Sequence, residues 1–248
     1  MNFILKKATA ARKNYGSARL TSHITWLVFH YTANDGDTDE SNAAYFQQRI
    51  VEASAHYFVD DDSVTQSVPD DHIAFSVGGS KWPDCTSTGG GAYYGRCTNA
   101  NSISIEMCDT VENGVHDFSA ATLRNAQELA AKLIVEYDID WDHIICHFDV
   151  NGKHCPGVTG WIGSDRSVWQ KFKKGLLAMT GEQIWAALTE YFSTQALPTT
   201  WDAAGQLQEA VNLGITDGKN PMLPTPRYQV AIMVKSGVKA ALKKYGLV

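Results

Sequence analysis

Residues 24–32 read ITWLVFHYT, and side chains on both alternating faces of this stretch are apolar. A strand that is apolar on both faces is typical of the centre of a sheet covered on both sides. The stretch therefore predicts a buried central strand, with His30 near its end. An imidazole at the end of a buried strand is more often a hydrogen-bonded core residue than a ligand, so His30 needs further support before it is given a function.

The segments that follow alternate between helix and strand patterns. Thr38 and Asp39 can cap a helix that runs to about Ile50. Residues 55–68, AHYFVDDDSVTQSV, predict a hairpin that turns at the central aspartates. Residues 79–101 form a Gly-rich connection, and a connection this long inside a compact domain is usually functional. We interpret it as a wall of a substrate groove.

A second strand is predicted at residues 102–108, SISIEMC. Its odd-numbered side chains are apolar, whereas Ser104, Glu106 and Cys108 share the other face. The register of this strand therefore decides where the Glu106 carboxylate lies. Amphipathic helices are predicted from Ser119 to about Tyr137 and at 165–177, with a short strand at 143–147 between them.

This order of elements predicts an α/β domain with a mixed central sheet flanked by helices. After about residue 180 the pattern contains helices only, near 182–193, 201–213 and 226–243, separated by Gly and Pro residues. We therefore expect two domains, a catalytic α/β domain over 1–178 and a small all-helical domain over 181–248.

Composition excludes several classes of function. The formal net charge is -6, and residues 1–180 carry -7 of it against +1 for the remainder. No Lys/Arg run is present, which argues against a nucleic-acid partner. No apolar run is long enough for a membrane span, and the N-terminus lacks the apolar segment of a signal peptide. We expect a chain made in the cytoplasm that acts elsewhere after release.

The histidines and cysteines carry the strongest local signal. Residues 147–157 read HFDVNGKHCPG, so that a strand-end imidazole, His147, is followed eight residues later by the thiol of Cys155. Together with His30 they would supply three protein ligands and leave one tetrahedral position open, as in catalytic zinc sites. We expect one Zn²⁺ per chain. The odd count of five cysteines also leaves at least one thiol outside disulfides, and whether Cys85 and Cys97 form a disulfide stays open.

Four motifs occur in a fixed order: His-Tyr-Thr at 30–32, Ser-Ala-His at 54–56, Asn-Ser-Ile-Ser-Ile-Glu at 101–106 and the segment from His147 to Gly157. In this order they resemble the zinc-dependent N-acetylmuramoyl-L-alanine amidases related to phage amidase-type lysozymes and peptidoglycan recognition proteins. The resemblance covers roughly residues 20–175. It implies the amidase-like mixed sheet and hydrolysis, by zinc-activated water, of the amide between N-acetylmuramic acid and L-alanine.

The resemblance also implies roles for single residues. His30, His147 and Cys155 would bind zinc, Glu106 would transfer the proton and Lys153 would stabilise the oxyanion. Ala55 stands where phage lysozyme relatives have a catalytic tyrosine, so the chain follows the glutamate branch. Ser76 stands where relatives often have a histidine. The residues expected to contact the substrate are Tyr31, Phe75, Ser76, Trp82 and Asn101.

Two other functions remain alternatives. One is a peptidoglycan-binding recognition module without catalysis, although such relatives typically lose the ligand cysteine that is present here as Cys155. The other is a zinc peptidase that cuts within the stem peptide. We favour the amidase, as a phage or prophage endolysin or an autolysin.

Residues 201–243 are similar to a single S-layer-homology-type motif. Motifs of this type generally anchor proteins to cell-wall polymers and usually occur in threes. We therefore expect either binding to a secondary cell-wall polymer or self-association, including a possible homodimer.

Overall fold

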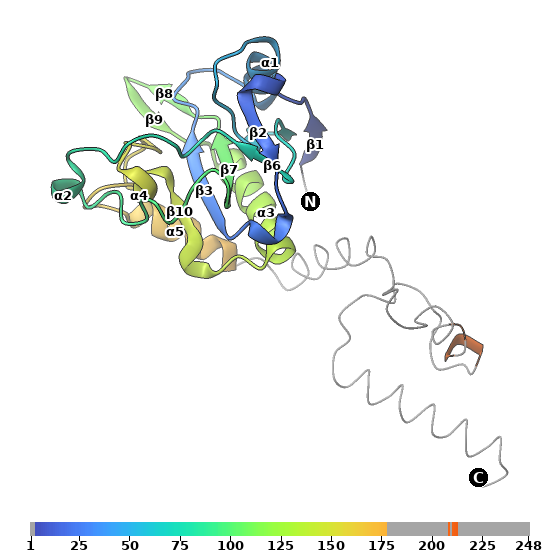
Figure 1. Cartoon of the computed structure of the whole chain (residues 1–248). Coiled ribbons are helices and arrows are strands. Elements are labelled where there is room, and N and C mark those ends of the chain that lie inside the picture. The colour runs from blue at the N-terminus through green and yellow to red at the C-terminus, as the bar shows by residue number, and fades with distance from the viewer. Residues whose placement is uncertain (1–2, 178–207, 209, 213–248) are drawn as a thin grey trace, which may run out of the picture. The chain divides into compact units, whose positions relative to one another are not determined.

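The computed structural model describes residues 3–177, 208 and 210–212 (Figure 1). The chain divides into two compact units, residues 1–179 and 180–248. The helices expected at 182–193 and 226–243 lie outside the described residues, as does most of the one expected at 201–213. Within the described part of the chain, no helix combines the length and apolar character needed to cross a membrane.

The N-terminal unit is built on a six-stranded mixed sheet with the order β1-β5-β4-β7-β3-β10. Only β4 and β5 pair antiparallel, and the other neighbours pair parallel. The predicted mixed α/β architecture is therefore confirmed. These strands are β1 (Ile4–Lys7), β3 (Trp26–Tyr31), β4 (Tyr57–Val59), β5 (Ser63–Gln66), β7 (Ser102–Met107) and β10 (Ile144–Cys146).

Helices and two small sheets surround this sheet. The α-helices are α1 (Asp39–Gln48), α2 (Cys85–Thr88), α3 (Ala120–Tyr137), α4 (His147–Asn151) and α5 (Ser167–Leu177). Short two-stranded sheets join β2 (Tyr15–Ala18) to β6 (His72–Ala74) and β8 (Thr110–Glu112) to β9 (Val115–Asp117). Single 3-10 turns, η1 to η3, lie at Arg12–Asn14, Thr21–His23 and Trp141–His143.

The two faces of the sheet carry different side chains. Ile103, Ile105 and Met107 of β7 are fully buried in the main core, which α3 and α5 complete. The alternate side chains, including Ser104 and Glu106, point to the other face, as the strand pattern predicts. Figure 1 shows the Gly-rich connection and α4 in front of the sheet, with α3 behind it. The same face also carries a second apolar cluster, which includes Trp26, Val28 and Ile145, so Glu106 and His30 lie at the strand ends beyond it.

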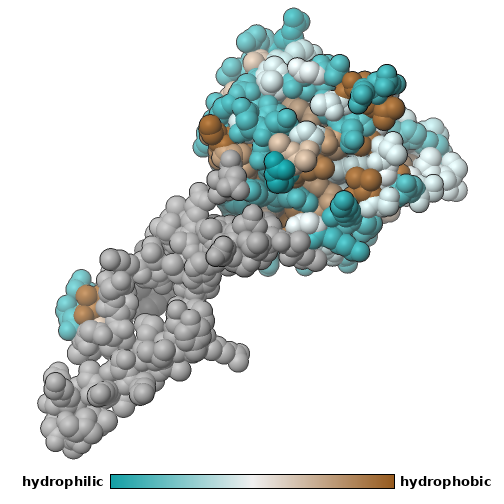
Figure 2. Space-filling view, turned by 180° about the vertical axis from the view of Figure 1, so that it is seen from behind, coloured by the Kyte–Doolittle hydropathy of each residue, from teal (hydrophilic) through white to brown (hydrophobic). Residues whose placement is uncertain are grey.

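Helix α3 follows its sequence signals closely. The Ser119 hydroxyl accepts hydrogen bonds from the backbone N–H groups of Ala121 and Thr122, and Asp138 ends the helix in the left-handed conformation. Leu129 and Leu133 are buried in the core on one side of the helix. Figure 2 shows the opposite face of the molecule, where hydrophobic residues lie in small patches separated by hydrophilic ones. An outer surface of this kind fits helices that bury one apolar side only.

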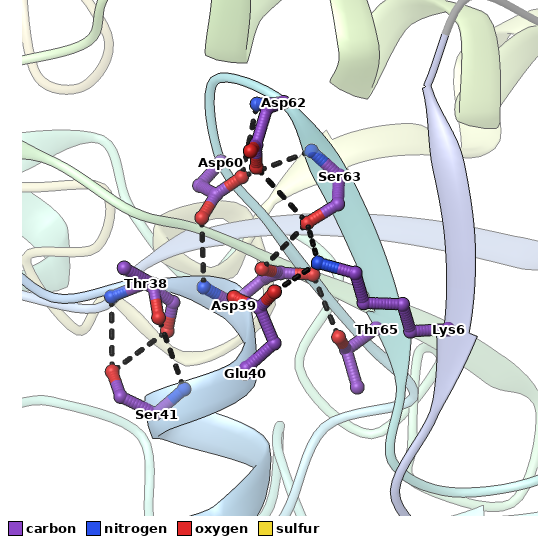
Figure 3. Close-up of polar contacts among 9 residues, drawn as sticks. All are labelled: Lys6, Thr38, Asp39, Glu40, Ser41, Asp60, Asp62, Ser63 and Thr65. Atoms are coloured by element: carbon purple, nitrogen blue, oxygen red, sulfur yellow. Dashed lines mark hydrogen bonds and ion pairs between the residues drawn. The ribbon is translucent and has the colours of Figure 1, made fainter.

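The start of α1 is fastened to the turn between β4 and β5 (Figure 3). The buried Asp39 carboxylate accepts hydrogen bonds from the hydroxyls of Ser63 and Thr65 at 2.9 and 2.7 Å. Asp60 accepts from the backbone N–H of Asp39 at 3.1 Å, and Lys6 pairs with Glu40. These hydrogen bonds satisfy the buried carboxylates of Asp39 and Asp60, so these two acidic residues have a structural role.

One element differs from its sequence expectation. His147 does not end a strand but begins the one-turn helix α4. The reason lies two residues later, where the Asp149 carboxylate accepts a hydrogen bond from the backbone N–H of Cys146 at 2.9 Å and caps the turn. The loop expected between His147 and Cys155 is therefore partly helical, which fixes the direction of the His147 ring.

Candidate active site

Three side chains from different elements meet at the strand ends, on the face of the sheet that carries Glu106. His30 lies near the end of β3, His147 begins α4, and Cys155 follows α4. Their nitrogen and sulfur ligand atoms all lie within 4.8 Å of one another, and the His30 Nδ1 atom is 3.7 Å from the Cys155 Sγ atom. All three residues are buried. The fold therefore brings the three predicted ligand residues together.

The chemistry of these three side chains fits a divalent metal. The Nε2 atom of His30 and both ring nitrogens of His147 are buried without a hydrogen-bond partner. Burial lowers the pKa of His147 to about 3 and raises the pKa of the Cys155 thiol, because each charged form loses its hydration. Two neutral imidazoles and one thiol match the donor set of catalytic zinc sites, and a bound cation would supply a partner for the ring nitrogens that lack one.

Glu106 stands beside this set. The parallel register of β3 and β7 pairs it with His30, and its Oε1 atom lies 3.7 Å from the His30 Nδ1 atom. Its Oε2 atom is buried without a partner. Burial raises the pKa of Glu106 to about 8, while the Lys153 ammonium acts in the opposite direction. A carboxyl group with a pKa near neutrality is suited to take up and return a proton.

Lys153 lies at the mouth of the site. Its backbone N–H donates to the Asn151 side-chain oxygen at 3.0 Å, which fixes the chain just after α4. The side chain is exposed and lines cavities on both sides of the metal-ligating residues. An ammonium group has the sign of charge that would stabilise an oxygen on which negative charge develops.

An ion pair holds α4 in place. The Arg166 guanidinium donates to both oxygens of Asp149, at 2.6 and 2.9 Å, and its Nε–H donates to the backbone carbonyl of Trp161 at 3.1 Å. Bidentate pairs of this kind fix geometry as well as energy. Because Asp149 also caps α4, the pair orients the helix that carries His147.

The Gly-rich connection is docked onto the same helix. Backbone N–H groups of Trp82 and Gly91 donate to carbonyls of Asn151 and Phe148 at 2.8 and 2.9 Å. Gly152 has a φ of 90° and lies against the Cys85 sulfur, where a side chain would clash. The connection is therefore a fixed wall of the site, as its length suggested. Cys85 and Cys97 are both free thiols.

The structure brings four of the five predicted substrate contacts to this region. Phe75, Ser76 and Trp82 line a cavity of about 470 Å³ with His147, whereas Tyr31 lines a smaller one with Glu106.

Asn101 is elsewhere. Its amide accepts from the Thr98 backbone N–H at 2.8 Å and donates to the Arg96 carbonyl at 2.9 Å, so it stabilises a turn. Asn99, two residues earlier, lines the larger cavity instead.

His56 has a structural role. Its Nδ1 atom accepts from the backbone N–H of Ser104 at 3.1 Å, and its Nε2 atom lies 2.9 Å from a guanidinium nitrogen of Arg19 and 3.2 Å from the His72 carbonyl oxygen. Ser76 makes a short hydrogen bond to Ser104.

Sequence reasoning missed other residues at the cavities, notably Glu52, Asn42 and Phe58. They lie on or beside α1 and β4, and no local motif marks them.

The chain is similar in sequence to a family of known proteins. The family model described as N-acetylmuramoyl-L-alanine amidase matches residues 20–158. A probable N-acetylmuramoyl-L-alanine amidase of Bacillus licheniformis is 29% identical over 184 residues, which are 68% of this chain and 47% of the relative. The amidase BlyA of Bacillus subtilis strain 168 is 28% identical over 192 residues, 75% of this chain and 50% of the relative. The chain spans about half the length of these curated relatives.

The fold is similar to solved structures as well. A mutant endolysin from Bacillus subtilis matches with a TM-score of 0.52 and 26% sequence identity. The match covers 70% of this chain and 99% of that one. The similarity therefore includes the whole of the solved chain.

Proposed function

The chain belongs to the N-acetylmuramoyl-L-alanine amidase family, and from that premise we propose that it hydrolyses the amide between N-acetylmuramic acid and L-alanine in peptidoglycan. One observation carries the proposal. The buried side chains of His30, His147 and Cys155 cluster together, three of their ring nitrogens have no hydrogen-bond partner, and the Glu106 carboxylate lies 3.7 Å from His30 Nδ1. A recognition module without catalysis has no need of this combination.

In this proposal His30, His147 and Cys155 hold one Zn²⁺ per chain. When bound, zinc polarises the amide carbonyl and lowers the pKa of water. Glu106 accepts a proton from the attacking water as its oxygen bonds to the lactyl carbonyl carbon. The Lys153 ammonium stabilises the negative charge on the carbonyl oxygen. Glu106 then returns the proton to the alanine nitrogen as the C–N bond breaks, and the products are a carboxylic acid and an amine.

The biological setting follows from the substrate. We propose that the protein acts on bacterial cell walls as an endolysin or autolysin. Residues 181–248 would bind a secondary cell-wall polymer or a second copy of the chain. Binding to a polymer would keep the enzyme on an insoluble substrate, where a second attachment raises the effective concentration.

Digestion of purified peptidoglycan tests the proposed reaction. The digest is analysed by mass spectrometry and by labelling of new amino termini, with and without a zinc chelator. The amidase frees N-terminal alanine and leaves muramic acid with a free lactyl carboxylate, and the chelator abolishes both. Release of N-terminal glutamate or a later residue would identify a stem-peptide peptidase. Wall binding without any new terminus would identify a recognition module.

A further inference from the structure

The β8–β9 hairpin follows the strand that carries Glu106, and one of its side chains contacts the wall of the candidate site. We infer that His116, fixed by Asp109, is a positioning residue that holds the Tyr31 ring at the cavity beside Glu106. This inference rests on the proposed function and adds two supporting residues to the site. Neither His116 nor Asp109 is among the residues that line this cavity, so both act through Tyr31.

Asp109 is a buried carboxylate where three segments of the chain meet. It is 2% exposed and lies two residues after β7. Its Oδ1 atom accepts hydrogen bonds from the Thr32 hydroxyl at 3.0 Å and from the backbone N–H of Asn34 at 3.4 Å. Its Oδ2 atom lies 2.5 Å from the Nδ1 atom of His116. Because an ionised carboxylate only accepts hydrogen bonds, His116 Nδ1 is the donor, and this bond fixes the orientation of the ring.

The His116 ring packs against Tyr31. The two ring centroids are 5.4 Å apart and the ring planes are nearly perpendicular, at 85°. Edge-to-face contacts of this kind are favourable and depend on geometry. The Tyr31 hydroxyl lies against Gly157, where a side chain would clash with it. Tyr31 is therefore contacted at its ring by His116 and at its hydroxyl by Gly157, which restricts the direction of its side chain.

Tyr31 belongs to the candidate site by its position. It follows the metal-ligating residue His30, and it lines a cavity of about 230 Å³ together with Glu106 and Lys153. A shift of its ring would change the shape of this cavity. Residues that contact a substrate must themselves be held by packing and hydrogen bonds from a supporting layer. His116 and Asp109 supply that layer for Tyr31.

The hairpin that carries His116 is also fastened beside the end of β3 (Figure 1). Val111 pairs with His116 across the hairpin, and its backbone N–H donates to the Asp35 side chain at 3.1 Å. Asn34 and Asp35 belong to the loop between β3 and α1. The hydrogen bonds of Asp109 and Val111 therefore join the hairpin to the segment that directly follows Tyr31.

A second histidine in the protein has nearly the same surroundings away from this cavity. His72 lies 2.8 Å from the Asp71 carboxylate, and its ring packs edge-to-face on Tyr15 with the centroids 5.5 Å apart and the planes at 81°. Its side chain is 29% exposed, against 30% for that of His116. Tyr15 is not among the residues that line the cavity with Glu106. His72 is therefore a matched control for His116.

Replacement of His116 by glutamine removes the ring and keeps a donor for Asp109. Kinetics are measured on a soluble N-acetylmuramoyl-peptide, with equal zinc content in all proteins. His116→Gln is expected to raise KM about tenfold and to leave kcat within about threefold, because the cavity wall shifts while Glu106 does not. The control His72→Gln should leave KM within about twofold. An unchanged KM in His116→Gln overturns the inference.

A double-mutant cycle tests whether His116 acts through Tyr31. In the Tyr31→Ala background, His116→Gln is expected to have no further effect on KM. A tenfold effect in both backgrounds overturns the inference, because His116 would then act by another route.

The opposite replacement keeps the ring and removes the ion pair. His116→Phe combined with Asp109→Asn leaves an aromatic ring on Tyr31 and no buried charge without its partner. Its KM is expected to stay within about threefold of that of the wild type. A role in stability alone would give the reverse pattern, with KM unchanged in His116→Gln. Either that pattern or a tenfold rise of KM in the double variant overturns the inference.

Binding separates this inference from the proposed function. The same N-acetylmuramoyl-peptide is titrated calorimetrically into the zinc-loaded full chain carrying Glu106→Gln, with and without His116→Gln. The second substitution is expected to weaken binding about tenfold. If the wild type frees no N-terminal alanine and this difference is found, the proposed reaction fails and the role of His116 stands. Equal binding, with normal release of alanine by the wild type, overturns the inference alone.

Discussion

The buried surroundings of the His56 imidazole determine its pKa. Burial lowers its pKa to about 3, and the nearby Arg19 guanidinium acts in the same direction. In the unfolded chain the pKa of a histidine is about 6.5. Between these values the unfolded chain binds a proton that the native protein excludes, so stability is lost as the pH falls from about 6.5 toward 3.

We predict that His56→Gln makes stability less dependent on pH. The variant loses hydrogen bonds and is less stable at pH 7, but its free energy of unfolding should fall less steeply below pH 6.5, by up to about 1.4 kcal/mol per pH unit. Urea unfolding between pH 4.5 and 7.5, with chelator present for both proteins, measures the difference. Equal slopes for the variant and the wild type would show that His56 titrates normally in the native state.

Asn14 supports the second residue-scale prediction. Asn14→Ala removes the acceptor of two backbone N–H groups and the donor to two carbonyls. We expect a loss of about 2 to 4 kcal/mol, because buried backbone groups are left without partners. Thermal and urea unfolding measure it. The exposed Asn34→Ala serves as control and should change stability by less than about 0.5 kcal/mol. A similar loss in both variants would contradict this structural role of Asn14.

The meeting of His30 and Glu106 could be predicted from sequence because each lies near the end of a strand with a clear pattern. Parallel pairing of the two strands brings them together. Asn101 is predicted to contact the substrate, but its side-chain amide makes hydrogen bonds within its own turn. Glu52 had no local signal, since its position depends on a hydrogen bond to a residue 38 positions earlier.

At the scale of elements, the pair of Arg166 with Asp149 is expected to set the orientation of α4. We predict that Arg166→Met lowers stability by about 2 to 4 kcal/mol, because the largely buried Asp149 carboxylate is left without its cation. Zinc affinity should fall about tenfold, as when a supporting partner of a metal ligand is lost. Chemical unfolding and competition with a chelator measure the two effects.

Lys171→Met is the control for this prediction. Lys171 lies on α5, which begins directly after Arg166, and its side chain is exposed. Both variants lose one positive charge from this region, whereas only Arg166→Met loses a contact with α4. If Lys171→Met weakened zinc binding equally, the effect would come from charge alone.

Longer elements could be predicted better than short ones. Helix α3 carries a cap, an amphipathic pattern and a clear end, and it was expected within one residue of its observed bounds. The hairpin of β8 and β9 was missed, although Asn113-Gly114 at its turn, with φ values of 52° and 77°, is a strong hairpin signal. Strands β1, β2 and β6 are three or four residues long, and pairing with distant segments defines them more than their own residues do.

At the scale of the whole molecule, the roles of the two units can be tested separately. Residues 1–179 contain the complete candidate site and their own core. We predict that deletion of residues 180–248 leaves kcat on soluble muramyl peptides within about twofold and weakens sedimentation with insoluble walls about tenfold or more. Equal wall binding by the truncated and full chains would rule out an anchoring role for residues 181–248.

The central claim is that Glu106 transfers the proton beside a zinc ion held by His30, His147 and Cys155. The most direct test measures Glu106→Gln and wild type side by side for zinc content and for release of N-terminal alanine from purified peptidoglycan, with the exposed Glu112→Gln as control. We predict about one zinc per chain in all three proteins, full activity in the control and a loss of about 10²- to 10⁴-fold in Glu106→Gln. Wild-type activity in Glu106→Gln at full zinc content would contradict the account.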